Sequence, residues 1–178
     1  MDSKIIWYVV ALIAILVAGY FMGFFGKQIV EYNGPAPPPG YVIPQGPLHW
    51  HPWLKIIVKG QEQKIPDNIG ITIGKTMDLD IGSDMGAAPI HTHDGAEDQN
   101  PNYGRKLHME SLAPYKKPIS LTLGYFFDIW GKTFNDTCIF EYCNGPNEIV
   151  KMFVNDKPNT DFENYFMRDG DRILIVYD

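Results

Sequence analysis

The sequence predicts an α+β fold, in which an N-terminal transmembrane helix precedes a β-rich domain with one short helix packed on a mixed sheet. Residues 5–25 are uncharged and almost wholly apolar, whereas the rest of the chain has short apolar segments between turn residues. Residues 123–130 carry apolar side chains at helical spacing. The 14 prolines and 17 glycines among 178 residues also indicate short elements and many turns.

The apolar segment at residues 5–25 has about the length that a helix needs to cross a bilayer. Aromatic residues lie near both of its ends, and Lys4 and Lys27 flank it, as is typical of a membrane interface. A cleaved signal peptide would have an apolar core of about 7–15 residues and an Ala-x-Ala-like site, and no clear site of this kind follows. Residues 1–28 are therefore predicted to be a retained anchor in membrane lipid.

A linker and a globular domain follow the anchor. Residues 29–47 are rich in proline and glycine, and proline favours extended polyproline geometry, so this segment is predicted to be a semi-rigid spacer. Residues 48–178 form the predicted domain. Its strands are expected at residues 53–59, 62–65, 90–93, 107–111, 137–142, 148–154 and 172–177. The helix is expected to be capped by Ser120 or Thr122 and to end at Gly131.

All five histidines fall in three short pieces, each with two ligand-type residues separated by one residue. Successive side chains of a strand point to opposite faces, so both members of each doublet would share a face. Imidazoles and a carboxylate gathered in this way suit a divalent transition metal, copper or zinc. A polar histidine network or a protonation-sensitive patch is the alternative interpretation. The doublets are His49/His51, His91/His93 and His108/Glu110.

A hairpin would bring two of the doublets together. If the strands at residues 90–93 and 107–111 pair across their polar connection, His91, His93 and His108 form a three-histidine site with an open coordination position. Glu110 would be a further ligand, a partner of a ligand histidine or a base. Asp94 points to the opposite face from His93, which favours a hydrogen-bonding role over direct ligation. His49 and His51 would complete this site or form a separate one.

Two features favour a domain outside the cytoplasm. Cys138 and Cys143 are the only cysteines and have four residues between them, so they are disulfide candidates in an oxidising compartment. Asn135 begins an Asn-Asp-Thr glycosylation sequon. The flanking charges give little orientation, because Asp2 offsets Lys4. The predicted location is the cell membrane, with a single pass and an outward-facing domain.

The net charge and the absence of known catalytic motifs restrict the functions that the sequence supports. The net charge of −6 and the lack of a basic run disfavour nucleic acid as a partner. No phosphate-binding loop, Gly-x-Ser-x-Gly or haem motif supports an enzyme. The sequence therefore predicts a membrane-tethered metal-binding domain for metal delivery or storage, or an accessory to a membrane metalloenzyme. The alternative is a non-catalytic subunit of a larger membrane complex, with Gly19 and Gly23 as a small-residue pair for packing on partner helices.

The motifs His-Trp-His-Pro, Pro-Ile-His-Thr-His-Asp, His-Met-Glu-Ser and Thr-Leu-Gly-Tyr-Phe-Phe-Asp-Ile-Trp-Gly lie between residues 47 and 178. Over this range the chain resembles an uncharacterised family of membrane-anchored prokaryotic domains, which implies no particular reaction. The order of a hairpin, a helix and further strands that end in Asp169-Gly170-Asp171 and a closing strand resembles the β-grasp (ubiquitin-like) folds. That resemblance implies a fold and not a function.

A second resemblance concerns the first cupin motif. Gly86, His91, His93, Glu97 and Gly104 nearly match its pattern, but four residues instead of five separate the first glycine from the first histidine. The second cupin motif needs a later histidine, and none follows position 108. This resemblance implies a metal-dependent, cupin-like enzyme as a further alternative.

Overall fold

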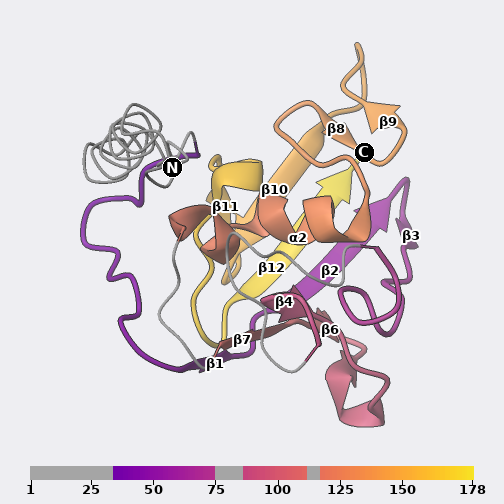
Figure 1. Ribbon diagram of the computed structural model, residues 1–178. Helices are drawn as coiled ribbons and strands as arrows, with labels where there is room; N and C mark the ends of the chain where they lie inside the picture. The colour runs from indigo at the N-terminus through magenta and orange to yellow at the C-terminus, as the bar shows by residue number, and fades with distance from the viewer. Residues whose placement is uncertain (1–33, 75–85, 112–116) are drawn as a thin grey trace, which may run out of the picture. The chain divides into compact units, whose positions relative to one another are not determined.

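The computed structural model describes residues 34–74, 86–111 and 117–178, all within one compact unit, Gly34–Asp178. These residues form a β-rich fold with one α-helix on a mixed sheet, which confirms the predicted α+β class (Figure 1). The predicted transmembrane helix at residues 5–25 lies outside the described residues. Within the described ranges, no helix is long and apolar enough to span a bilayer.

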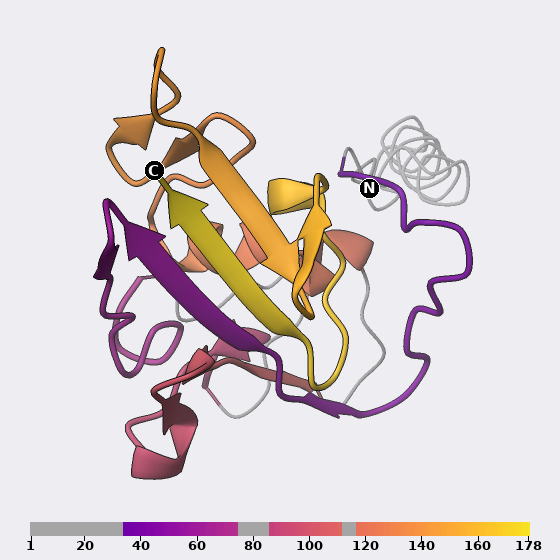
Figure 2. The ribbon, with the colours of Figure 1, turned by 180° about the vertical axis from the view of Figure 1, so that it is seen from behind.

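The main sheet has seven strands, in the order β11-β10-β12-β2-β6-β5, with β3 paired to β2. Its two central strands, β2 (Trp53–Val58) and β12 (Arg172–Tyr177), are parallel neighbours (Figure 2). The other pairs are antiparallel. The strand predicted over residues 62–65 is present as β3, which is shorter than expected and pairs with β2. The remaining strands are β3 (Gln61–Glu62), β5 (Gln99–Asn100), β6 (Gly104–Lys106), β10 (Val150–Val154) and β11 (Lys157–Asn159).

Alternate side chains of the two central strands enter the core. Leu54, Ile56 and Ile175 are fully buried, and Ile56 pairs directly with Ile175 across the parallel ladder. Burial of one aliphatic side chain of this size stabilises the fold by about 1.5–3 kcal/mol. The alternation of buried and half-buried positions along β2 and β12 therefore fixes which face of the sheet receives the helix.

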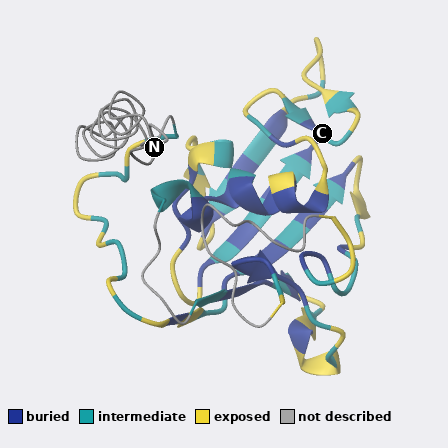
Figure 3. Ribbon diagram, viewed as in Figure 1, coloured by how far each residue is buried: buried dark blue, intermediate teal, exposed yellow. Residues whose placement is uncertain are grey.

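The helix α2 (Leu123–Trp130) covers that face of the main sheet, and its buried side chains join the core (Figure 3). Its limits match the prediction. The backbone N–H of Tyr125 donates to Oγ1 of Thr122, and Gly131 ends the helix with φ +71°. Only glycine adopts this left-handed conformation without strain. Phe126 and Phe127 are buried, so the aromatic stripe forms core and not a ligand site.

A second, three-stranded sheet carries most of the predicted ligand residues. It has the order β1-β7-β4, with β7 (His108–Ser111) between β1 (Leu48–Trp50) and β4 (Ile90–His91). Both pairs are antiparallel, so the predicted pairing of β4 with β7 is confirmed for His91 and His108. The strand predicted over residues 90–93 is shorter than expected, because β4 ends at His91 and His93 lies outside it. Strand β7 follows β6 of the main sheet after Leu107 alone. The described residues also form three short 3-10 helices: η1 (Ala96–Asp98), η2 (Pro118–Leu121) and η3 (Phe162–Asn164).

The single strand predicted over residues 137–142 is wrong. The segment is a small hairpin of β8 (Cys138–Ile139) and β9 (Tyr142–Cys143), because Phe140 has φ +56° and turns the chain back. Cys138 and Cys143 lie opposite each other in this hairpin and form a disulfide bond.

The end of the predicted linker packs on the domain. Tyr41 donates its hydroxyl to the carbonyl of Met167 at 2.7 Å, and its ring lies 5.1 Å from that of Phe166. The guanidinium of Arg168 lies 5.0 Å from the same ring. These contacts explain why the compact unit begins at Gly34 and includes part of the predicted spacer.

Any side chain at Gly70 is expected to destabilise the fold, because this glycine packs on the strand that carries His91. A Cβ atom at this position would lie 2.9 Å from the carbonyl oxygen of Ile90 and 3.0 Å from Cβ of His91, and φ is +77°. Gly60→Ala is the matched control, because Gly60 has φ +75° and open space around it. Denaturant unfolding should show a loss of about 1 kcal/mol for Gly60→Ala and about 2–4 kcal/mol for Gly70→Ala. Equal losses would contradict the close packing.

Candidate metal centre

The register of the second sheet brings the three doublets together. His49 of β1 lies opposite Glu110 of β7, and His91 of β4 lies opposite His108 of β7. Side chains at directly opposed positions of antiparallel strands project to the same face. The central strand β7 thus contributes one ligand-type residue toward each neighbouring strand.

Thr92 explains how the His-Thr-His segment is held. Its side chain is fully buried. Its Oγ1 donates to the carbonyl of Pro66 at 2.9 Å and accepts from the backbone N–H of Ile69 at 3.0 Å. The threonine anchors the segment from one side, which leaves His91 and His93 to face the site.

Four residues form the first group of potential metal ligands. Nε2 of His49 lies 3.0 Å from Oε1 of Glu110, and Nδ1 of His108 lies 3.4 Å from the same oxygen. The ring of His51 packs edge-on against that of His108, with centroids 4.8 Å apart. One ligand atom from each of these four residues lies within 4.8 Å of all the others.

Three residues form the second group. The Nε2 atoms of His91 and His93 are 3.0 Å apart, and Nε2 of His91 lies 3.9 Å from Oε2 of Glu110. Their ligand atoms also lie within 4.8 Å of one another. Glu110 belongs to both groups. A ligand atom of His108 falls in the group of His49 and His51, and its ring also lies 4.3 Å from that of His93. The predicted triad of His91, His93 and His108 therefore stays a prediction.

Hydrogen bonds behind two of the rings determine which nitrogens face the site. Nδ1 of His91 lies 2.9 Å from the carbonyl oxygen of Ala88, which can only accept, so Nδ1 carries the proton and Nε2 presents its lone pair to His93. Nε2 of His108 lies 3.0 Å from Oδ2 of Asp98, which leaves Nδ1 as the nitrogen of that ring that can bind a metal ion. Ligand histidines in metalloproteins are oriented by such carbonyls and carboxylates.

Asp98 is a buried carboxylate with two cationic or proton-donating neighbours. Lys106 binds its Oδ1 with an Nζ–O distance of 2.8 Å, and His108 occupies Oδ2. Burial alone would raise the pKa of Asp98, but the hydrogen bonds from Lys106 and His108 lower it. The carboxylate therefore remains ionised and orients the ring of His108.

Three of the imidazoles, those of His51, His91 and His108, are held in the neutral form that metal ions require. Burial lowers the pKa of His91 and His108, although hydrogen bonds to Ala88 and Asp98 act in the opposite direction. Burial also lowers the pKa of His51, and the charges of neighbouring histidines add to this effect. A neutral imidazole offers a lone pair without first losing a proton.

The predicted role of Asp94 falls to Asp98 instead. Asp94 is exposed and makes no hydrogen bond or ion pair with the described residues, whereas Asp98 bonds a ring of the site. Glu97, the carboxylate of the cupin-like spacing, is exposed and belongs to neither ligand group. Asp98 lies in a short 3-10 helix of a polar connection, where no periodic pattern distinguishes it from the other acidic residues.

A cavity of about 470 Å³ opens beside the second ligand group. Its polar wall contains His49, His91, His93 and Glu110. The rest of the lining is largely apolar and includes Pro47, Leu48, Ile71, Ala87 and Ala88. A small molecule in this cavity would contact both apolar side chains and the ligand atoms of the second group.

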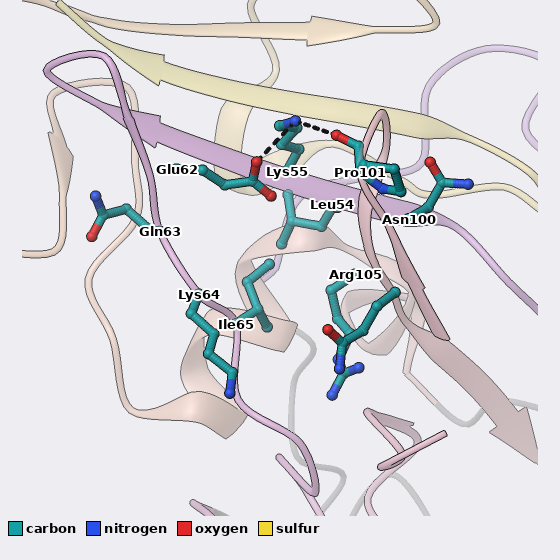
Figure 4. A pocket seen from close by; sticks show the side chains of 11 residues that line it. Leu54, Lys55, Glu62, Gln63, Lys64, Ile65, Asn100, Pro101 and Arg105 are labelled. Atoms are coloured by element: carbon teal, nitrogen blue, oxygen red, sulfur yellow. Dashed lines mark hydrogen bonds and ion pairs between the residues drawn. The ribbon is translucent and has the colours of Figure 1, made fainter. Parts of the chain in front are cut away.

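A different cavity, of about 320 Å³, lies at the edge of the main sheet (Figure 4). Lys55 pairs there with Glu62 at 2.9 Å and donates to the carbonyl of Pro101 at 2.7 Å. Arg105 pairs with Asp67. Two of the three basic side chains beside this cavity, Lys55 and Arg105, thus already have acidic partners, and no histidine lines it.

The other sequence-predicted site residues lie in or next to the β8–β9 hairpin. Oδ1 of Asn135 accepts hydrogen bonds from the backbone N–H groups of Thr137 and Cys138. This arrangement closes the turn that leads to the disulfide. The Asn135 sequon stays a prediction.

Comparison of the chain with protein-family models, curated proteins and solved structures finds no match. The predicted resemblance to a family of membrane-anchored domains therefore stays a prediction, and functional inference depends on the geometry of the site.

Replacement of Asp98 should weaken metal binding without removing a ligand. Asp98→Asn abolishes the charge that orients the ring of His108, so we expect the Zn²⁺ affinity to fall by about 10- to 100-fold. Asp94→Asn is the matched control and should leave the affinity within about twofold, because Asp94 is exposed. Competition with a chromophoric chelator measures both values. Equal affinities for the two variants would contradict the assigned role of Asp98.

The metal-free protein should lose stability on acidification. His51, His91 and His108 have a lower pKa in the folded protein than the ordinary value of 6.5, so the unfolded chain binds more protons below that value. Their contribution is complete above about pH 6.5 and is lost as the pH falls toward the folded pKa values. Denaturant unfolding at about pH 7.5 and about pH 5.5 should show this loss, with a smaller loss in His91→Gln. A constant free energy of unfolding would contradict it.

Proposed function

We propose that this protein is a membrane-anchored, outward-facing metal-binding domain for copper or zinc, which acts in metal delivery or as an accessory to a membrane metalloenzyme. One observation carries the proposal: the two groups of ligand atoms together use all five histidines of the chain and share Glu110. A ring nitrogen of His91 bonds the carbonyl of Ala88, and one of His108 bonds the carboxylate of Asp98. Such hydrogen bonds are typical of ligand histidines in metal centres.

The donor set supports a transition metal over calcium or magnesium. Imidazole nitrogen suits zinc and copper, whereas calcium and magnesium prefer sites made of oxygen ligands. The site offers five imidazoles and the single carboxylate of Glu110. The side chain of His49 is 66% exposed, which gives an ion a path between the site and solvent. Such access suits a domain that receives or releases its metal.

The membrane location and the outward orientation have separate support. Residues 5–25 are apolar and long enough for a transmembrane helix. The disulfide between Cys138 and Cys143 suits an oxidising compartment, because thiols in the cytosol are kept reduced. Both features agree with an anchor that presents the domain outside the cytoplasm.

We also propose that the domain is β-grasp-like. The described order of elements supports this: the β2–β3 hairpin, then α2, then strands that end with β12 beside β2. The turn before β12 is held by Asp171, which accepts hydrogen bonds from the hydroxyl of Tyr165 and the N–H of Arg168, both at 2.7 Å. The second sheet with its histidines is then an addition to this framework.

Elemental analysis tests the proposed function. The protein purified without a histidine tag should contain at least one copper or zinc ion per chain. The variant His49→Ala/His93→Ala/Glu110→Gln should contain none, because it leaves only two ligands in the first group and one in the second. All three side chains are at least partly exposed, so the buried rings of His91 and His108 keep their hydrogen bonds. A metal-free wild type that binds no added ion, or a variant with full metal content, would contradict the proposal.

A further inference from the structure

The two carboxylate oxygens of Glu110 face different ligand groups. Oε1 lies 3.0 Å from Nε2 of His49 and 3.4 Å from Nδ1 of His108. Oε2 is the oxygen nearer to His91, with an Nε2–O distance of 3.9 Å. Glu110 is the only member that the two groups share among the described residues. A carboxylate in this position can bind one ion with each oxygen.

The geometry points to a two-ion centre, in which Glu110 bridges one zinc or copper ion held by His49, His51 and His108 and a second ion held by His91 and His93. This inference rests on the proposed function and specifies the number of ions and how they are coupled. It assigns a ligand role to every histidine of the chain.

A single ion would not use all the potential ligands of the two groups. Zinc takes about four ligands in protein sites, and the first group alone supplies four. His91 and His93 would then bind no ion, and their Nε2 atoms, 3.0 Å apart, would bond only to each other. The Nδ1 proton of His91, donated to Ala88, leaves the lone pair of Nε2 directed at His93 and Glu110. A second ion would replace the hydrogen bond between these two nitrogens and use both of them as ligands, together with Glu110.

Negative charge around the pair offsets the repulsion between two cations. Glu110 contributes its charge directly between the two groups, and paired ions in enzymes lie about 3.5–4 Å apart. Asp98 bonds Nε2 of His108 with an O–N distance of 3.0 Å, but Lys106 already neutralises its charge. Asp169 accepts the backbone N–H of His51 at 2.8 Å and adds a further carboxylate near the first group.

The two ions differ in their coordination. The first has four protein ligands, which is typical of a closed site, whereas the second has three and an exchangeable position. Residues of the second group also line the cavity of about 470 Å³, so this position is accessible to a ligand. The positive charge of the pair favours water, hydroxide or a small carboxylate at this position.

Zn²⁺ titration of the metal-free, untagged full chain counts the ions. We expect two tightly bound Zn²⁺ ions per wild-type chain, one in His93→Ala and one in His49→Ala/His51→Ala. Glu110→Gln should weaken the binding of at least one ion by about tenfold or more, because the amide has a single, neutral oxygen and cannot bind an ion at each end. In the Cu²⁺-loaded wild type, electron paramagnetic resonance should show a spin-coupled pair, and either histidine variant should give the spectrum of an isolated Cu²⁺ ion.

One Zn²⁺ ion per wild-type chain, lost in either histidine variant, would overturn the two-ion centre and leave the proposed function intact. Two Cu²⁺ ions without spin coupling would overturn the bridge. A wild-type chain that binds no Zn²⁺ or Cu²⁺ would overturn the proposed function and this inference together.

Discussion

The position of Glu110 at the centre of a three-stranded sheet is the constraint on which the candidate site depends. Because β7 lies between β1 and β4, its residues face histidines from two strands that are far apart in the sequence. Gly70 packs closely on β4, and Thr92, which follows β4, donates a hydrogen bond to the carbonyl of Pro66. Asp169 accepts a hydrogen bond from the backbone of His51, next to β1. A shift of either strand by one residue would turn its histidines to the other face of the sheet. The packing of the fold and the chemistry of the site therefore rest on the same register.

Much of this arrangement could be predicted from the sequence, because its signals are local. The alternation of apolar residues identifies β2 and β12, and the helical spacing of Phe126, Phe127 and Trp130 identifies α2 with its cap and its terminal glycine. The strict spacing of the histidine doublets identifies the potential ligands. It also predicted the pairing of β4 with β7, since both are short and flank one polar connection.

The remaining features depend on contacts between distant segments. The grouping of His108 with His49 and His51 follows from the β1–β7 register, which no local pattern fixes. Asp98 and Asp94 are both acidic residues of one polar connection, and only the fold shows that Asp98 is buried against His108. The positive φ of Phe140 divides a predicted strand. The hydrophobic pattern could not predict it, because an apolar side chain at this position fits a continuous strand equally well.

The central claim is that metal ions bind on both sides of the Glu110 carboxylate. Anomalous diffraction from crystals of the zinc-loaded protein, recorded on both sides of the zinc absorption edge, tests it most directly. We expect two anomalous peaks, one within bonding distance of each oxygen of Glu110, with the histidines of one group around each. A zinc-loaded crystal with no anomalous peak at Glu110, or with zinc bound elsewhere, would contradict the account.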